Sequence, residues 1–228
     1  SDMTVILFLR HAHSEANGAG ILAGQISGIH LSNIGRKQAK TFARNYADMY
    51  FSEIHISPLE RCRETISPYL DHVKKNSKKR ISVIENRNFI EMDYGSWSGM
   101  KLRKLALLPL WRRIQRNPST VTFPGGESFI ALNKRVHKGL LAIARKNPRG
   151  QVLVVTHADV IKLALANALK MELNDFQKIA IDPASVSAIE IDGNAFRVLT
   201  MNSKPEPFIV GGNRFLLGGG AGAKARKV

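Results

Sequence analysis

The sequence of 228 residues predicts an α/β protein, a three-layer α/β/α sandwich with a mostly parallel central sheet and an antiparallel edge strand. Two observations carry this prediction. Short apolar runs alternate with segments of helical periodicity, and the run 151–156 is almost wholly apolar, as in a central parallel strand covered on both faces. Near the end of the chain, two strand-like segments flank Asp192-Gly193-Asn194, which predicts a hairpin and hence an antiparallel edge.

The first half of the chain contains three predicted strands and two predicted helices. Ser32 suits the N-cap of the first helix. Pro58 suits the first turn of the second helix, which we expect to bend or end near Pro68. The expected elements are a strand over 5–9, a Gly- and Ser-rich loop over 17–29, a helix from 32 to about 50, a strand over 53–56, a helix from 58, a charged connector over 73–80 and a strand over 81–85.

The second half begins with the least regular segment, residues 86–127, which holds several glycine and proline breakers. We expect a helix there over about 101–115, interrupted at Pro109. The clearest amphipathic helix lies within 127–146, because apolar residues recur there at helical spacing. The remaining expected elements are the strand 151–156, a helix to about 170, and the hairpin strands 186–191 and 196–201.

These elements predict a single domain over 1–202, in which 86–127 forms a cap or insert over the ligand pocket. A C-terminal extension, 203–228, differs from the domain in composition. Its segment F-I-V-G-G-N-R-F-L-L suits a small hairpin, and the last residues, rich in glycine and basic side chains, are typical of a flexible tail.

The composition is that of an ordinary globular protein, with 44% hydrophobic and 23% charged residues. No apolar run approaches the roughly 20 residues of a membrane-spanning helix, and we expect no signal peptide. The single cysteine, Cys62, rules out an intrachain disulfide and suits a reducing compartment, so we expect a cytoplasmic location.

The formal net charge of +16 indicates an anionic substrate or partner, or else a basic surface without a single purpose. Nucleic-acid binding is the less favoured explanation, because the basic residues are not interleaved with the aromatic residues that single-strand binders use. The sequence leaves the oligomeric state open.

Five side chains stand where a ligand site is expected. Arg10-His11 follows the first strand and His157 follows the strand 151–156, and open α/β sheets bind ligands at carboxyl ends of strands. Arg61 lies on the helix from 58, and Glu91 lies in the irregular segment. Arginine fits phosphate oxygens, histidine can be a nucleophile, and a carboxylic acid can protonate a leaving alkoxide. Metal-free phosphoryl transfer onto histidine would use all five, although each alone also has an ordinary explanation as a strand end, surface or core residue.

The stretch L-R-H-A-H-S-E-A-N resembles the signature L-R-H-G-x-[ST]-x-x-N of the histidine phosphatase (phosphoglycerate mutase-like) superfamily. Further segments match motifs of that family in the same order: A-G-Q-I-S-G-I-H-L-S-N-I-G-R-K-Q-A, S-P-L-E-R-C-R-E-T, E-M-D-Y-G-S-W-S-G, P-G-G-E-S and V-V-T-H-A-D-V-I. Together they span most of residues 4–200. One such motif is weak, but six in the right order make a strong resemblance.

The resemblance implies a role for each matching residue. His11 would become phosphohistidine, and Glu91 would be the general acid for the leaving group and then the base for water. The phosphoryl group would be bound by Arg10, Ser14, Asn17, Arg61 and His157. We expect the surrounding cations to lower the pKa of Glu91 and bound phosphate to raise it, so that Glu91 is protonated mainly in the substrate complex.

Several positions depart from the family pattern. Ala12 replaces the usual glycine, and its methyl group would crowd a tight turn. His13 either adds positive charge to the pocket or faces solvent. Asp159 places a carboxylate near the phosphate site, and Ser98 replaces a frequent glutamate. Gln25-Ile26-Ser27 lacks a frequent aspartate.

The resemblance therefore implies a metal-independent phosphomonoesterase of the phosphatase branch, which needs no cofactor and acts through phosphohistidine on a small anionic phosphorylated metabolite. Mutases of the superfamily carry extra segments after the acid motif, whereas here Gly99 is followed directly by the basic stretch 101–116. We expect that stretch to form a helical cap over the active site. The alternatives are a phosphoglycerate mutase-like phosphotransferase and a non-catalytic module that binds phosphate or nucleic acid.

Overall fold

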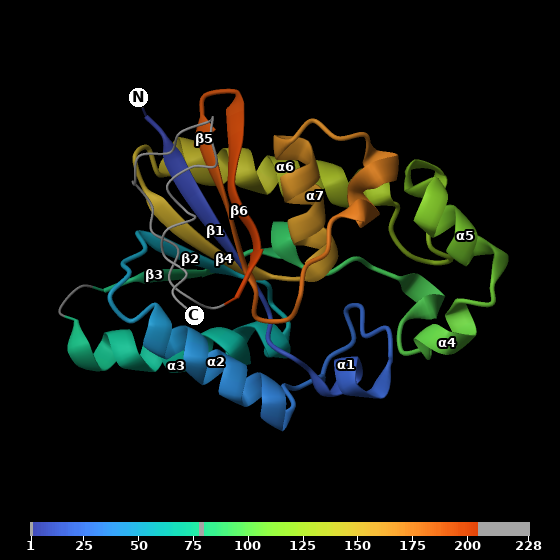
Figure 1. Cartoon of the computed structure of the whole chain (residues 1–228), viewed down its shortest axis with the longest axis horizontal. Helices are drawn as coiled ribbons and strands as arrows, with labels where there is room; N and C mark the ends of the chain where they lie inside the picture. Colours follow the sequence, from blue (N-terminus) through green and yellow to red (C-terminus); the bar gives the residue numbers. More distant parts are fainter. Residues whose placement is uncertain (1, 78–79, 205–228) are drawn as a thin grey trace, which may run out of the picture.

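The computed structural model describes residues 2–77 and 80–204. Within these residues, six strands form one sheet in the order β3-β2-β4-β1-β5-β6 (Figure 1). The strands are β1 (Thr4–Arg10), β2 (Glu53–Ile56), β3 (Ser82–Glu85), β4 (Gln151–Thr156), β5 (Val186–Asp192) and β6 (Ala195–Ser203). The strands β3, β2, β4 and β1 are mutually parallel, β5 pairs antiparallel with β1, and β6 pairs antiparallel with β5. The predicted mostly parallel sheet with an antiparallel edge is therefore confirmed.

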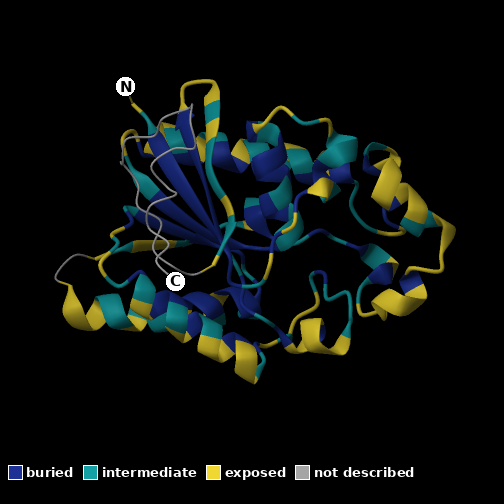
Figure 2. Ribbon diagram, viewed as in Figure 1, coloured by how far each residue is buried: buried dark blue, intermediate teal, exposed yellow. Residues whose placement is uncertain are grey.

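Two pairs of helices cover the two faces of the sheet. On one face lie α2 (Asn33–Asn45) and α3 (Glu60–Asn76), and on the other lie α6 (Phe129–Lys146) and α7 (Ala158–Ala168) (Figure 1). The inner strands β1, β2, β4 and β5 are almost wholly buried, whereas the edge strands β3 and β6 and the outer helix faces are partly exposed (Figure 2). This arrangement confirms the predicted three-layer sandwich.

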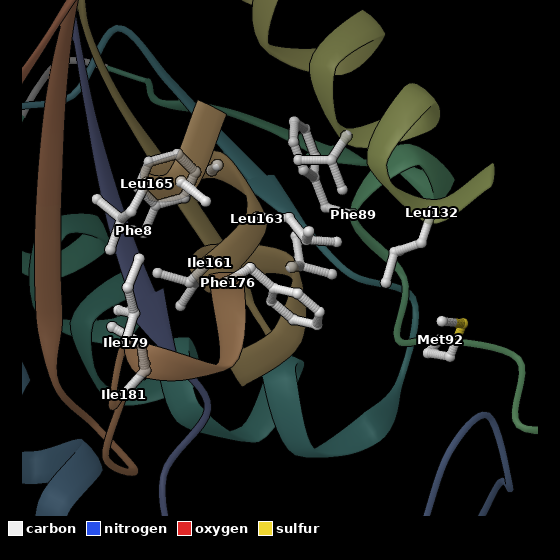
Figure 3. Packing of buried hydrophobic residues seen from close by; sticks show 14 of the residues in the cluster. Phe8, Phe89, Met92, Leu132, Ile161, Leu163, Leu165, Phe176, Ile179 and Ile181 are labelled. Carbon is white, nitrogen blue, oxygen red and sulfur yellow. The ribbon is translucent and has the colours of Figure 1, made fainter. Parts of the chain in front are cut away.

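The alternating side chains of β1 supply both halves of the core, since successive residues of a strand point to opposite faces. Val5, Leu7 and Leu9 pack with α2 and α3. Ile6 and Phe8 pack with α6 and α7, and Figure 3 shows Phe8 in the same cluster as Leu165 of α7. Burying each such side chain contributes about 1.5–3 kcal/mol. This two-sided burial fixes the position of β1, and with it the residues that follow β1.

Two local predictions were wrong. The expected loop after β1 contains a short helix, α1 (Glu15–Ala19), which begins with a capping box between Ser14 and Asn17. The helix α3 begins at Glu60, not at Pro58, and continues through Pro68 to Asn76. An internal proline costs roughly 3 kcal/mol, but Tyr69 on the same helix is fully buried against the core, which offsets that cost.

The segment between β3 and α6 is built from short helical pieces. The predicted helix here is interrupted at Pro109, as expected, and forms α4 (Leu102–Leu105) and α5 (Pro109–Arg116). The other pieces are η1 (Arg87–Phe89), η2 (Gly95–Trp97) and η3 (Pro118–Thr120), and η4 (Leu173–Lys178) follows α7. In Figure 1, α4 and α5 lie beyond the sheet, on the side to which the chain leaves β1 for α1.

Among the helices of the described residues, none has the length and apolar character needed to cross a bilayer. The hairpin and tail predicted within 203–228 fall almost entirely outside the described residues.

Candidate active site

The site begins where two neighbouring parallel strands end. Arg10 of β1 lies opposite Thr156 of β4, so the residues that follow them, His11 and His157, are placed side by side. The backbone N–H of His11 donates to the carbonyl oxygen of Thr156 at 2.9 Å. The two imidazole rings lie with centroids 5.3 Å apart. The sheet register thus brings together two histidines that are 146 positions apart in the sequence.

Six of the seven predicted site residues line one cavity of about 340 Å³: Arg10, His11, Ser14, Asn17, Arg61 and Glu91. The seventh, His157, is fully buried beside His11, and its Nδ1 lies 3.7 Å from Oε2 of Glu91. Leu102 of α4 and Trp111 and Ile114 of α5 also line the cavity. The helical cap therefore covers the same cavity that the strand ends open into.

His11 is held in one tautomer by the backbone. Its Nδ1 lies 2.8 Å from the carbonyl oxygen of Ala12, which can only accept, so Nδ1 carries the proton. Burial lowers the pKa of His11 well below its ordinary value, and the charges of Arg61 and Arg10 lower it further. The imidazole is therefore neutral, and its Nε2 keeps the free lone pair that a nucleophile needs.

His157 is held in place by Ser57, the residue that follows β2. Its Nε2 forms a 2.7 Å hydrogen bond with Oγ of Ser57. Its Nδ1 is buried and has no hydrogen-bond partner within residues 2–77 and 80–204. Burial lowers the pKa of His157 well below its ordinary value, with Arg61 and His11 adding to the effect. The ring is neutral and turns one unoccupied nitrogen towards the site.

Arg61 is buried, Arg10 is half-buried, and each keeps one buried donor without a partner among the described residues. Arg61, only 2% exposed, donates from Nη2 to the carbonyl oxygen of Gly24 at 2.7 Å. Arg10 donates from Nη1 to the carbonyl oxygen of Ile181 at 2.6 Å. Nη1 of Arg61 and Nε of Arg10 are buried without a partner in the part of the chain that the structure describes. Leaving such charged donors unpaired is costly, so they indicate a site for an anion.

Glu91 has both its backbone and its carboxyl group fixed. Gln25 Nε2 and Arg135 Nη2 donate to its carbonyl oxygen at 2.9 and 3.1 Å, and the N–H of Met92 donates to Oε1 at 2.8 Å. Burial and then the nearby Asp159 carboxylate raise the pKa of Glu91 to about 7, against the opposing charges of Arg61 and Arg10. The expectation that the surrounding cations would give Glu91 a lowered pKa in the empty site was wrong, because desolvation raises the pKa by more than the cations lower it.

Ser14 and Asn17 bind each other through the cap of α1. The Asn17 Oδ1 accepts from the Ser14 N–H at 3.0 Å, and Ser14 Oγ accepts from the Asn17 N–H at 3.1 Å. Because Oδ1 is used in the cap, the Nδ2 amide is the group of Asn17 that remains to meet a ligand. The capping box thus orients a hydrogen-bond donor at the cavity wall.

The positions that depart from the family pattern have specific surroundings. Ala12 is fully buried in a small cluster with Leu31, Ala39 and Ala184, so its methyl group is accommodated. The His13 Nδ1 hydrogen-bonds Oγ of Ser32, the N-cap of α2, at 2.7 Å, so this ring supports a helix start and does not line the cavity. Asp159, in contrast, does line the cavity.

Motif spacing did not identify Tyr94, Lys162 and Gln177, which also line the cavity. The Tyr94 hydroxyl donates to Asp159 Oδ2 at 2.9 Å. The sequence held one signal for them, the unusual aspartate after His157-Ala158, which needs partners in a buried site. Groups of three or more histidine, cysteine, aspartate or glutamate side chains able to hold a metal ion are not found among the described residues.

A model of the histidine phosphatase superfamily, branch 1, matches residues 6–204. Phosphoserine phosphatase 1 of Hydrogenobacter thermophilus is 33% identical over 203 residues, 88% of this chain and 92% of that protein. A 2,3-bisphosphoglycerate-dependent phosphoglycerate mutase of Thermoplasma acidophilum is 25% identical over 88% of this chain and 93% of its own length. The structure of a putative α-ribazole-5′-P phosphatase from Escherichia coli covers 90% of this chain and 99% of its own, with a TM-score of 0.78 and 22% identity. The chain therefore belongs to the histidine phosphatase superfamily, branch 1.

Proposed function

We propose that this protein is a metal-independent phosphomonoesterase that transfers the phosphoryl group of its substrate to His11 and then to water. The observation that carries the proposal is the state of His11. Its Nδ1 is fixed by the Ala12 carbonyl oxygen, and its Nε2 remains free beside the unpaired donors of Arg10 and Arg61. A neutral nucleophile thus lies beside a site built for a phosphate dianion.

In the first step, Nε2 of His11 forms a bond to phosphorus while the ester P–O bond breaks. The leaving oxygen takes both electrons of that bond and receives the proton of the Glu91 carboxyl group. Arg10, Arg61 and the Nδ1 side of His157 bind the non-bridging oxygens, whose charge grows in the transition state. Asn17 adds an amide donor to the same oxygens, and Ser14 holds Asn17 in place.

In the second step, water attacks phosphorus and the P–N bond to His11 breaks. The Glu91 carboxylate formed in the first step takes one proton of the water, so the carboxyl group and the neutral imidazole are both restored. Inorganic phosphate then leaves. A pKa of about 7 suits Glu91 to both roles, because the group gives and takes a proton near neutral pH.

The cap selects the substrate in this proposal. Leu102, Trp111 and Ile114 come from the segment 86–127, which we assign as a cap within a domain of residues 1–202. A cavity of about 340 Å³ fits a small metabolite, and the similar proteins named above include a phosphoserine phosphatase, a phosphoglycerate mutase and a putative α-ribazole-5′-P phosphatase. The cytoplasmic location stays a prediction, as does the view that nucleic-acid binding is the less favoured explanation of the net charge, and the oligomeric state stays open.

The test is phosphate release from p-nitrophenyl phosphate in the presence of EDTA, with wild type beside His11→Ala and Glu91→Gln. We expect turnover by the wild type, and none by His11→Ala although it keeps the wild-type circular dichroism spectrum. Brief reaction with 32P-labelled substrate, followed by acid and alkali treatment, should show protein-bound phosphate that is labile in acid and stable in alkali. Turnover that survives His11→Ala would overturn the proposal. Phosphate moved between positions of 3-phosphoglycerate, without release, would indicate the mutase alternative.

A further inference from the structure

A second set of charged and polar side chains lines the cavity in addition to the phosphate donors. Asp159 and Lys162 are one turn apart in α7, and both line the cavity with Gln177 of η4. Their side chains are only 15% and 17% exposed. One negative and one positive group are therefore placed, largely desolvated, in a pocket whose bound phosphate is already matched by Arg10 and Arg61.

The charges of this second group are only loosely paired with each other. The Asp159 Oδ1 lies 3.7 Å from the Lys162 Nζ and 3.5 Å from Nε2 of Gln177, both long for a hydrogen bond. Lys162 instead donates to the Gln177 Oε1 at 3.0 Å, and Tyr94 donates to the other carboxylate oxygen of Asp159. An oxygen of Asp159 and the remaining protons of Lys162 are thus available to a ligand.

The opposite charges of Asp159 and Lys162 restrict which leaving groups can bind beside them. A leaving group with an extra carboxylate alone meets Lys162 but is repelled by Asp159, and one with an ammonium alone meets the reverse conflict. A leaving group that carries both charges on one carbon satisfies both side chains. Its ammonium and carboxylate groups lie a few ångströms apart, which is also the separation of Asp159 and Lys162.

We propose that Asp159 and Lys162 form a subsite for a zwitterionic leaving group, so that the preferred substrates are O-phosphorylated amino acids with free α-ammonium and α-carboxylate groups. Asp159 binds the ammonium and Lys162 binds the carboxylate. This assignment rests on the proposed phosphatase function. It gives a role to the aspartate that stands where the family usually has glycine.

The first measurement compares four esters at one pH: O-phosphoserine, which carries both groups, phosphoethanolamine with the ammonium alone, 3-phosphoglycerate with the carboxylate alone, and glycerol 3-phosphate with neither. We expect phosphoserine to have the highest kcat/KM, by about tenfold or more over glycerol 3-phosphate. A wild type that hydrolyses glycerol 3-phosphate or 3-phosphoglycerate as well as phosphoserine would overturn the subsite.

The second measurement uses ratios between substrates, which cancel effects common to all of them. In Asp159→Asn the ratio of phosphoethanolamine to glycerol 3-phosphate should fall about 10- to 100-fold, the range of one charged hydrogen bond. In Lys162→Met the ratio of phosphoserine to phosphoethanolamine should fall similarly. Ratios that stay at wild-type values in both variants would also overturn the proposal.

A matched control is available in the same protein. Asp175 and Lys178 have the same spacing in the sequence and a 2.9 Å ion pair, but they lie outside this cavity, with Asp175 41% exposed. Asp175→Asn removes the same charge and should leave both ratios at their wild-type values. If the wild type releases phosphate from none of these esters or from p-nitrophenyl phosphate, the phosphatase function fails. If turnover depends on His11 but shows no zwitterion preference, only the subsite fails.

Discussion

Glu91→Gln should abolish turnover and at the same time stabilise the protein at alkaline pH. The side chain of Glu91 is 12% exposed, and burial and Asp159 raise its pKa from the ordinary 4.5 to about 7. A group whose pKa is higher in the folded than in the unfolded state favours folding when protonated. That contribution is complete below about pH 4.5 and is lost as the pH rises through about 7.

The size of the effect follows from the two pKa values. Each tenfold change in an equilibrium is worth 1.36 kcal/mol, so moving a carboxyl pKa from 4.5 to about 7 corresponds to about 3 kcal/mol. Glutamine has the same shape, keeps an acceptor for the Met92 N–H, and cannot ionise. We therefore expect Glu91→Gln to exceed the wild type by about 3 kcal/mol near pH 8 and by less than about 1 kcal/mol near pH 5.

The assay is urea unfolding of both proteins at these two pH values, followed by circular dichroism in a buffer without phosphate. Phosphate must be absent because a ligand of the folded state would add its own stabilisation. Glu85→Gln serves as a control, since Glu85 is 58% exposed and should show no such pH dependence. A variant that is no more stable than the wild type near pH 8, or equally more stable at both pH values, would refute the reasoning.

Three further predictions concern other residues. Burial raises the pKa of Glu53, but hydrogen bonds from Lys146 and other neighbours outweigh burial and lower that pKa to about 2. The ionised carboxylate therefore stabilises the fold, so Glu53→Gln should be less stable than the wild type near pH 7. The difference between the two proteins should shrink as the pH falls towards 2, in the same urea experiments. Asp159→Asn removes a charge that raises the pKa of Glu91, so the alkaline fall of kcat/KM should begin at lower pH; an unmoved pH profile would exclude this coupling. Gly35→Ala places a Cβ 1.9 Å from the His13 carbonyl oxygen, so we expect a Tm lower by several degrees, whereas an unchanged Tm would show that α2 moves aside freely.

The strongest sequence patterns predicted the elements that hold the site. The strand β4 has the predicted limits, because the almost wholly apolar run 151–156 is the pattern expected of a buried strand. The motif residues after β1 and β4 meet because these strands are adjacent and parallel, which the strand-end rule anticipates. The expected three layers follow from the same patterns.

The features that were mispredicted depend on contacts that are remote in sequence. Periodicity could not reveal α1, since its five residues are stabilised by a cap at Ser14 and not by an apolar face. The continuation of α3 past Pro68 depends on burial of Ile66 and Tyr69 against the core. The pKa of Glu91 depends on the depth of a cavity that no local pattern encodes.

The polar side chains that form the site also lower the stability of the folded protein. Arg10 and Arg61 hold unpaired buried donors, and Glu91 holds a carboxyl group that resists ionisation. Each costs folding free energy in the empty protein. Arg10 stands at the end of β1, a strand whose five apolar residues are all buried, so a firmly anchored backbone holds one of these unsatisfied side chains. A phosphate dianion pairs the arginine donors and stabilises the protonated carboxyl group, so substrate binding reduces the costs that the empty site carries.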